Sequence, residues 1–222
     1  MAVNVYNAVT KLMFLFGLFF VSFGPSFSFF LLDFLYSSKV SSTDAPKVMS
    51  YYCLFVFTMA VNGVTEAFAH AVATPSELSF FNMAMFFFSA IYILLALLLI
   101  SYFKTIGLIL SNCINMSLRM AFSIYFTHGF FKRNNLEKRI WEIFPDWKVL
   151  SCFLLCFFAT RFSEERLCNH ELVGNLGVLR STRCYLHLFV GSFCFLSCLA
   201  SIYLFERKWL KTVIQIWKEK KQ

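Results

Sequence analysis

Blocks of about twenty apolar residues, separated by short polar or Pro/Gly-containing stretches, recur along the whole chain. A helix that crosses about 30 Å of hydrocarbon needs about 20 mostly apolar residues. The pattern therefore predicts six membrane-spanning helices in an all-α polytopic bundle, at residues 12–32, 48–73, 80–100, 105–127, 149–167 and 184–205.

The pattern marks some of these spans more clearly than others. Only residues 101–104 separate the third span from the fourth, which predicts a tight antiparallel hairpin. The fifth span is apolar only as far as Thr160 and then carries Arg161, Glu164, Glu165 and Arg166. The first block follows Lys11 as a signal peptide would, but it is long enough to span and has no small-x-small cleavage site, so we expect a helix that stays in the membrane.

The composition supports a membrane protein and excludes other classes. Apolar residues make up 59% of the chain and charged residues 14%, against about 45–50% and about 25% in soluble domains. With 31 phenylalanines among 222 residues, the chain is too apolar to remain disordered. We find no internal repeat, so the sequence predicts one membrane domain, residues 1–205, followed by a basic tail, residues 206–222.

The basic residues predict an orientation. With six spans both termini lie on one side, and that side carries 12 lysines and arginines against 7 on the other. The positive-inside rule therefore places both termini in the cytosol. The net charge of +8 is then mainly a cytosolic surface charge that faces anionic membrane lipids, and it does not require a nucleic-acid partner. The tail reads either as an interfacial helix or as the emerging end of the sixth span.

Two of the predicted spans carry a polar stripe. Ionisable groups in hydrocarbon cost about 2.5–3.5 kcal/mol each on insertion scales, so they usually turn inward and serve a purpose. Spacing of three or four residues places each set on one helix face. The stripe of the second span is Asn62, Glu66 and His70, and that of the fourth is Asn112, Asn115, Arg119 and Ser123.

The two charged residues of these stripes lie at similar depth. Both spans run toward the predicted cytosolic side, with Glu66 about 27 Å and Arg119 about 21 Å along them. One interpretation is a polar cavity in which Arg119, with His70, attracts an anionic head group, because a guanidinium donates paired hydrogen bonds to phosphate. The other is an ion pair with Glu66 and asparagine bridges that only hold the helices together.

The cysteines and the remaining motifs give little evidence for other chemistry. Cys152/Cys156 and Cys194/Cys198 are i, i+4 pairs in apolar spans without neighbouring histidines or acids, which favours core packing over metal binding. Cys168 and Cys184 flank a loop on the predicted non-cytosolic side, so we expect a disulfide there. We see no acid/base or metal constellation and no nucleotide-binding loop, so we predict a protein that is not an enzyme and has no catalytic residues, metal or cofactor.

Several short runs resemble a known family. The residues 62–68, Asn-Gly-Val-Thr-Glu-Ala-Phe, are the most specific part, together with Tyr52-Cys53-Leu54, residues 107–110, Asn112-Cys113, Asn115-Met116 and Arg119. They resemble the carboxy-terminal lobe of the eukaryotic Rft-type family, the Man(5)GlcNAc(2)-PP-dolichol translocation proteins. That family belongs to the multidrug/oligosaccharidyl-lipid/polysaccharide exporter superfamily.

This resemblance implies an endoplasmic-reticulum membrane protein of N-glycan assembly. Its expected ligand is the dolichol-linked heptasaccharide, which passes from the cytosolic to the lumenal leaflet. Family members are more than twice as long and have two lobes, so this chain resembles one lobe and needs a partner, or is a fragment. The partner would be the missing amino-terminal lobe or another glycan-assembly protein. The alternatives are a scaffold that transports nothing and an inactive fragment.

Overall fold

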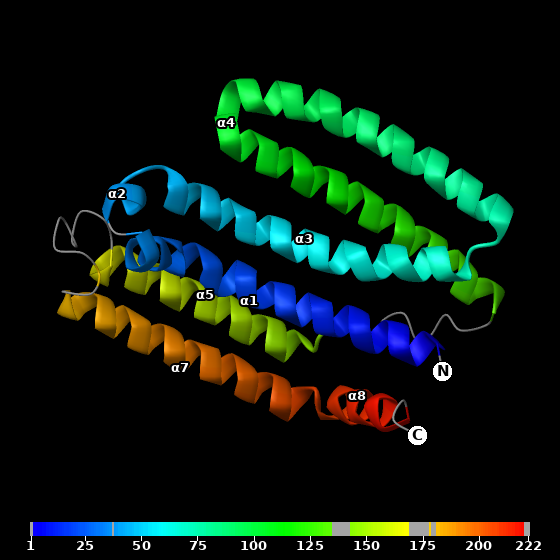
Figure 1. Cartoon of the computed structure of the whole chain (residues 1–222). Helices are drawn as coiled ribbons and strands as arrows, with labels where there is room; N and C mark the ends of the chain where they lie inside the picture. The colour runs from blue at the N-terminus through cyan, green and yellow to red at the C-terminus, as the bar shows by residue number, and fades with distance from the viewer. Residues whose placement is uncertain (1, 37, 135–142, 169–177, 179–180, 220–222) are drawn as a thin grey trace. The chain divides into compact units, whose positions relative to one another are not determined.

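The structure, a computed structural model, describes residues 2–36, 38–134, 143–168, 178 and 181–219. Nearly all of them are helical and none is in a strand, which confirms the all-α prediction. Figure 1 shows the helices α1 (Ala2–Tyr36), α2 (Ser38–Ser41), α3 (Ala45–Val72), α4 (Pro75–Arg133), α5 (Trp147–Leu167), α7 (Thr182–Phe205) and α8 (Arg207–Glu219).

Four of the described helices are long and apolar enough to cross a membrane, which makes this a multi-pass membrane protein. They are the helical stretches Val3–Tyr36, Ala45–Val72, Pro75–Arg133 and Thr182–Phe205. The third of these consists of two helical arms that meet at a kink at Lys104, and it holds two of the predicted spans. Helix α5 is not among the four, because its last two turns carry Arg161, Glu164, Glu165 and Arg166. The six-span boundaries therefore stay predictions.

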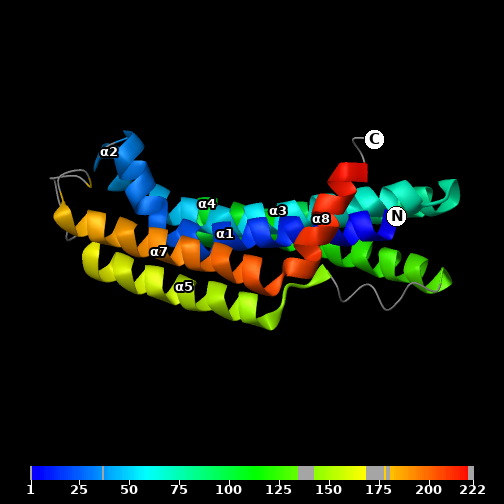
Figure 2. The same cartoon turned by 90° about the horizontal axis from the view of Figure 1, so that it is seen from below.

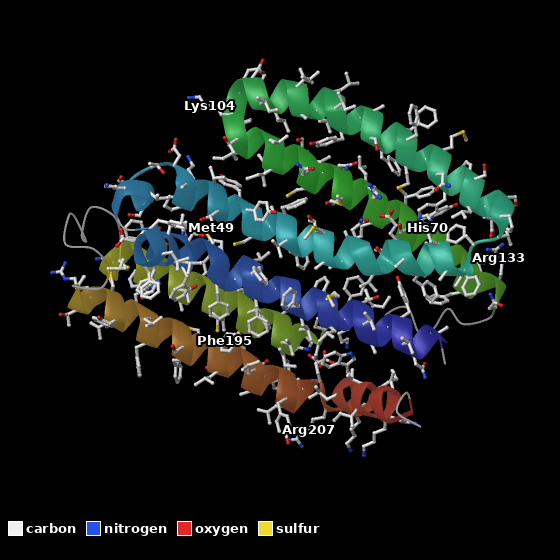
Figure 3. All side chains as sticks on the ribbon, in the orientation of Figure 1. Met49, His70, Lys104, Arg133, Phe195 and Arg207 are labelled. Carbon is white, nitrogen blue, oxygen red and sulfur yellow. The ribbon has the colours of Figure 1, made fainter. Side chains whose placement is uncertain are left out.

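Helix α4 folds back on itself at Lys104, as Figure 1 shows and Figure 3 labels. Lys104 has φ 51° and ψ −129°, outside helical values and in the range where side chains are strained. Three residues later, Gly107 meets the preceding arm, since an added Cβ there would lie 2.1 Å from the carbonyl oxygen of Leu99. A residue without a side chain is therefore needed for this close approach.

The two ends of α4 are tied together at the open end of this hairpin. Thr74 caps the helix and forms a reciprocal capping box with Glu77, and Pro75 occupies the first turn. The Nη1 of Arg133 donates to the Glu77 carboxylate at 2.8 Å. The backbone N–H of Thr74, followed by the hydrogen bond from Arg133, lowers the pKa of Glu77 to about 2. Sequence-local capping and a contact across 56 residues thus fix the same carboxylate.

The chain divides into two compact units. The first comprises Met1–Gly17, Leu54–Phe144 and Thr212–Gln222, and the second comprises Leu18–Cys53 and Pro145–Lys211. In the first unit, aromatic rings pack where the start of α1 meets the end of α3. The ring centroids of Tyr6 and Phe68 lie 4.2 Å apart, and those of Tyr6 and Phe131 lie 5.9 Å apart.

The second unit is organised around α5 and α7, which lie side by side in Figures 1 and 2. Helix α7 also approaches α1 closely, because a Cβ on Gly191 would lie 2.2 Å from the ring of Phe27. Phe19 of α1 joins the two others through ring contacts with Phe153 at 4.9 Å and Phe195 at 5.1 Å. Aromatic packing therefore forms much of this core.

Candidate functional site

Glu66 of α3 and Arg119 of α4 form a two-point ion pair within the first unit. The Nε of Arg119 donates to Oε2 of Glu66 at 3.2 Å, and Nη2 donates to Oε1 at 2.5 Å. This side-on arrangement uses the planar fork of the guanidinium, which a lysine does not offer. The side chains of Glu66 and Arg119 are 17% and 26% exposed, so the pair is partly shielded without being sealed.

Asn62 orients the carboxylate from one helical turn away. Its Nδ2 donates to Oε2 of Glu66 at 2.9 Å and lies 3.6 Å from the sulfur of Met116 on α4. Because a carboxylate only accepts hydrogen bonds, the amide nitrogen must face it. The Oδ1 of Asn62 is then buried and has no hydrogen-bond partner among the described residues. The amide therefore offers an unused acceptor beside the ion pair.

His70 lies one turn beyond Glu66 on the same face of α3, where Figure 3 labels it. Its Nε2 is 3.8 Å from Oε1 of Glu66, and its ring meets Phe81 edge-on at 4.8 Å. At 36% exposure it is the most accessible member of the stripe. The predicted spacing thus places Asn62, Glu66 and His70 together, and Arg119 joins them from the returning arm of α4.

The two asparagines predicted on α4 do not join this group through any hydrogen bond that the structure describes. The Nδ2 of Asn112 donates to the carbonyl of Leu108 in its own helix at 3.0 Å. Asn115 is buried, and its Oδ1 has no hydrogen-bond partner in the described part of the chain. A buried amide oxygen without a hydrogen-bond donor costs about 1–3 kcal/mol. The Oδ1 of Asn115 is therefore a second unused acceptor, on the same helix as Arg119.

Arg119 retains hydrogen-bonding capacity beyond Glu66. A guanidinium has five N–H donors, and Glu66 accepts from two of them. No described residue accepts from the others. We refer to Asn62, Glu66, His70 and Arg119 as the polar site. It can hold a second anionic oxygen on Arg119 while Glu66 continues to orient the guanidinium.

An apolar groove of about 750 Å³ lies along a neighbouring face of α3 in the first unit. The space beside Gly63 is open, since an added Cβ would have no heavy atom within 4 Å. Small residues at i, i+4 and i+8 form its floor, and the start of α1 forms one wall. The lining is Val5, Tyr6, Val9, Gly63, Val64, Ala67, Phe68, Ala71 and Val72. Gly63 and Ala67 directly follow Asn62 and Glu66 in sequence, so groove and polar site occupy adjacent faces of one helix.

The predicted cysteine pair of the second unit comes together. The sulfur atoms of Cys168 and Cys184 lie 2.7 Å apart, and both residues are buried beside Phe29 and Val178. Burial raises the pKa of the Cys168 thiol. Both residues are reduced in the structure, so the disulfide stays a prediction.

Two buried polar groups of the second unit had no prediction. Asp33 accepts hydrogen bonds from the Ser41 hydroxyl at 2.5 Å and from the backbone N–H of Val178 at 2.8 Å. His187 lies between the Ser163 hydroxyl at 3.0 Å and the carbonyl of Ser26 at 3.1 Å. The carbonyl assigns the proton to Nε2, so His187 donates there and accepts from Ser163. Both groups are satisfied internally, which indicates structural roles.

Comparisons with known proteins show which protein family contains sequences similar to this chain. Residues 1–216 match the sequence profile of the Rft protein family. The chain is similar to the Man(5)GlcNAc(2)-PP-dolichol translocation protein RFT1 of Dictyostelium discoideum, with 32% identity over 203 residues, which is 91% of this chain and 32% of that protein. The mouse protein of the same name is 32% identical over 207 residues, 93% of this chain and 37% of its own length.

The matched region is only part of each relative. The Xenopus tropicalis protein of the same name is 30% identical over 208 residues, 94% of this chain and 37% of that protein. This chain thus spans about a third of the length of the curated relatives that it matches. No solved structure matches it.

Proposed function

This chain belongs to the Rft protein family, and we propose that it takes part in the translocation of Man(5)GlcNAc(2)-PP-dolichol from the cytosolic to the lumenal leaflet of the endoplasmic reticulum. The observation that carries the proposal is the match over residues 1–216 to a family whose curated members are named for this translocation. The proposed role is transport in protein N-glycosylation, without catalysis by this chain. Both termini are proposed to face the cytosol.

The polar site supplies groups that suit the head of such a lipid. A pyrophosphate presents several anionic oxygens, and Arg119 has donors left after its contact with Glu66. In this proposal Glu66 neutralises and orients Arg119 when the ligand is away, and His70 and Asn62 flank the bound phosphate. Asn112 and Asn115 lie farther along the same face of α4, where they would meet sugar hydroxyls.

The apolar groove suits the other end of the lipid. An isoprenoid chain gains about 25 cal/mol for each Å² of apolar surface that it buries, and every side chain lining the groove except the Tyr6 hydroxyl is apolar. In this proposal the first isoprene units lie along Gly63, Ala67 and Ala71 while the phosphates contact Arg119. One helix then presents both halves of an amphipathic ligand on adjacent faces.

A chimera tests the function directly. In it, this chain replaces the matching third of the Dictyostelium discoideum relative, and cells lacking their own Rft protein express either the chimera or the intact relative. We expect the chimera to restore glycosylation of a reporter glycoprotein and to remove accumulated Man(5)GlcNAc(2)-PP-dolichol. A chimera that reaches the endoplasmic reticulum at the level of the intact relative and restores neither would overturn the proposal.

A matched pair of variants tests the groove. Ala67→Phe fills it, whereas Ala90→Phe adds the same ring to an exposed position on the outer arm of α4. We expect Ala67→Phe to reduce translocation by the chimera several-fold at unchanged protein level, and Ala90→Phe to leave it intact. Equal activity of both variants would remove the groove from the lipid path.

A second candidate function is a scaffold that moves no lipid. The observation that favours it is the ion pair itself, since polar contacts such as Glu66–Arg119 hold membrane helices together. A scaffold needs only that α3 and α4 stay packed together, and it needs no free donor on Arg119. Restoration of glycosylation by a chimera that lacks Arg119 but folds normally would support this candidate.

A further inference from the structure

Three cysteine sulfurs converge where α5 and α7 face each other in the second unit. The Sγ atoms of Cys152, Cys156 and Cys198 all lie within 4.8 Å of one another. The first two are one turn apart on α5, and the third comes from α7, so the two helices supply the cluster together. We call these three residues the thiol cluster.

The surroundings of the thiol cluster exclude water from most of it. Cys156 and Cys198 are buried, and Cys152 is half-buried. Cys194, one turn before Cys198, is also buried, and its carbonyl oxygen lies 3.6 Å from the sulfur of Cys156. Phe153, on the next position of α5, is buried against Phe19. Of the three cysteines, only Cys152 is partly exposed, so a metal ion would reach the cluster from its side.

From this geometry we propose that the thiol cluster binds a soft, thiophilic metal ion of the Cu(I) class in a three-coordinate site. Thiolate sulfur is the ligand type that selects Cu(I) over the harder cations. With metal–sulfur bonds of about 2.3 Å, a trigonal site places its sulfurs about 4.0 Å apart. The three sulfurs therefore need to move by less than about 1 Å to close around an ion.

The number and type of the ligands favour Cu(I) at this position. Each cysteine that coordinates Cu(I) does so as a thiolate, so binding releases the protons of the three thiols to solvent. The copper keeps its oxidation state, so no electron acceptor is required. Structural zinc takes four ligands, whereas among the described residues only the sulfurs of Cys152, Cys156 and Cys198 converge here, so the number and softness of the ligands favour Cu(I). The site is independent of the polar site and of the proposed translocation.

Copper titration of the purified full chain in detergent tests the proposal. The chain is loaded with Cu(I) under reducing, anaerobic conditions against a colorimetric Cu(I) chelator, and copper–sulfur coordination is followed by X-ray absorption. We expect one tightly held Cu(I) per chain with sulfur-only coordination. Cys156→Ser and Cys198→Ser should each weaken binding at least tenfold.

Control variants separate this site from the other cysteines. Cys113 is a buried cysteine of the first unit, outside the cluster, and Cys113→Ser should bind Cu(I) like the unaltered chain. Where a serine destabilises the helix pair, Cys156→Ala keeps the site apolar and still removes the ligand, and the thermal unfolding of each variant is measured without metal. Failure of the unaltered chain to retain copper against the chelator, or equal binding by a folded Cys156→Ala variant, would overturn the proposal.

Discussion

Arg119 donates hydrogen bonds to both oxygens of the Glu66 carboxylate, through Nε at 3.2 Å and Nη2 at 2.5 Å, and so joins the returning arm of α4 to α3. Asn62 holds the same carboxylate from the side of α3. Because the guanidinium keeps unused donors, this contact is compatible both with helix packing and with a ligand. The two roles differ in what they predict for neutral replacements.

Removing one partner of the pair should destabilise the protein more than replacing both. A sealed ion pair that loses one member costs about 3–5 kcal/mol. Since both side chains here are partly exposed, we expect Glu66→Ala to lower the free energy of unfolding by about 2 kcal/mol. The double replacement Glu66→Gln with Arg119→Gln should stay within about 1 kcal/mol of the unaltered protein. Denaturant unfolding in detergent measures both values, and equal losses would contradict the strength assigned to the pair.

Glu77 should make stability depend on acidic pH. Its pKa is about 2 in the folded protein against an ordinary 4.5, so the ionised carboxylate stabilises the fold above about pH 4.5, and this contribution declines as the pH falls toward 2. The unfolding temperature of the unaltered protein should therefore exceed that of Glu77→Gln near neutral pH. The difference should shrink steadily below about pH 4.5. A difference independent of pH would show that Glu77 is not held by Thr74 and Arg133.

Gly107 should be intolerant of a side chain. An added Cβ meets the backbone carbonyl of Leu99 at 2.1 Å, and backbone cannot move aside as a flexible side chain can. Gly107→Ala should therefore destabilise the hairpin of α4 by at least about 1–3 kcal/mol. Gly129→Ala on the same helix has open space and should be neutral or stabilising by up to about 1 kcal/mol. Comparable unfolding temperatures for the two variants would contradict the close approach at the bend.

Cys168 and Cys184 should form a disulfide when the chain is made in the secretory pathway. Their sulfurs already lie in contact, and the predicted topology places them on the oxidising, non-cytosolic side. Proteolytic peptides that contain the two cysteines should be linked before reduction and separate after it. Identical peptide masses before and after reduction would remove the disulfide, and a Cys53→Ser variant should leave the link unchanged.

The sequence was sufficient to predict the fold class and the pairing of Glu66 with Arg119, and the role of these residues as a ligand site stays a prediction. The i, i+4 spacing placed Asn62, Glu66 and His70 on one face, and similar depth in the membrane brought Arg119 to Glu66. The hairpin was predictable because residues 101–104 interrupt two apolar blocks. The bend at Lys104 falls within that interruption.

Other contacts could not be predicted because they depend on which helices become neighbours. The spacing of Cys152 and Cys156 showed that they share a face, but only the packing of α5 on α7 brings Cys198 to them. The burial of His187 likewise depends on Ser26, which lies 161 residues away. The spacing predicted Asn112 on the same face as Arg119, and in the structure its amide donates to a carbonyl of its own helix. Periodicity assigns a face to a residue without naming its partner.

The central claim is that Arg119 contacts the phosphates of the transported lipid, and the double neutral chimera tests it most directly. The measurement is glycosylation of the reporter in cells lacking their own Rft protein, with Glu66→Gln and Arg119→Gln together in the chimera, corrected for protein level. Loss of a charged hydrogen bond to phosphate predicts a decrease of about tenfold or more, although the double variant folds. Glu66→Gln alone, which keeps the guanidinium, should retain most of the activity. Undiminished glycosylation with the folded double variant would contradict a contact between Arg119 and the lipid phosphates. The pair would then serve only to hold α3 and α4 together.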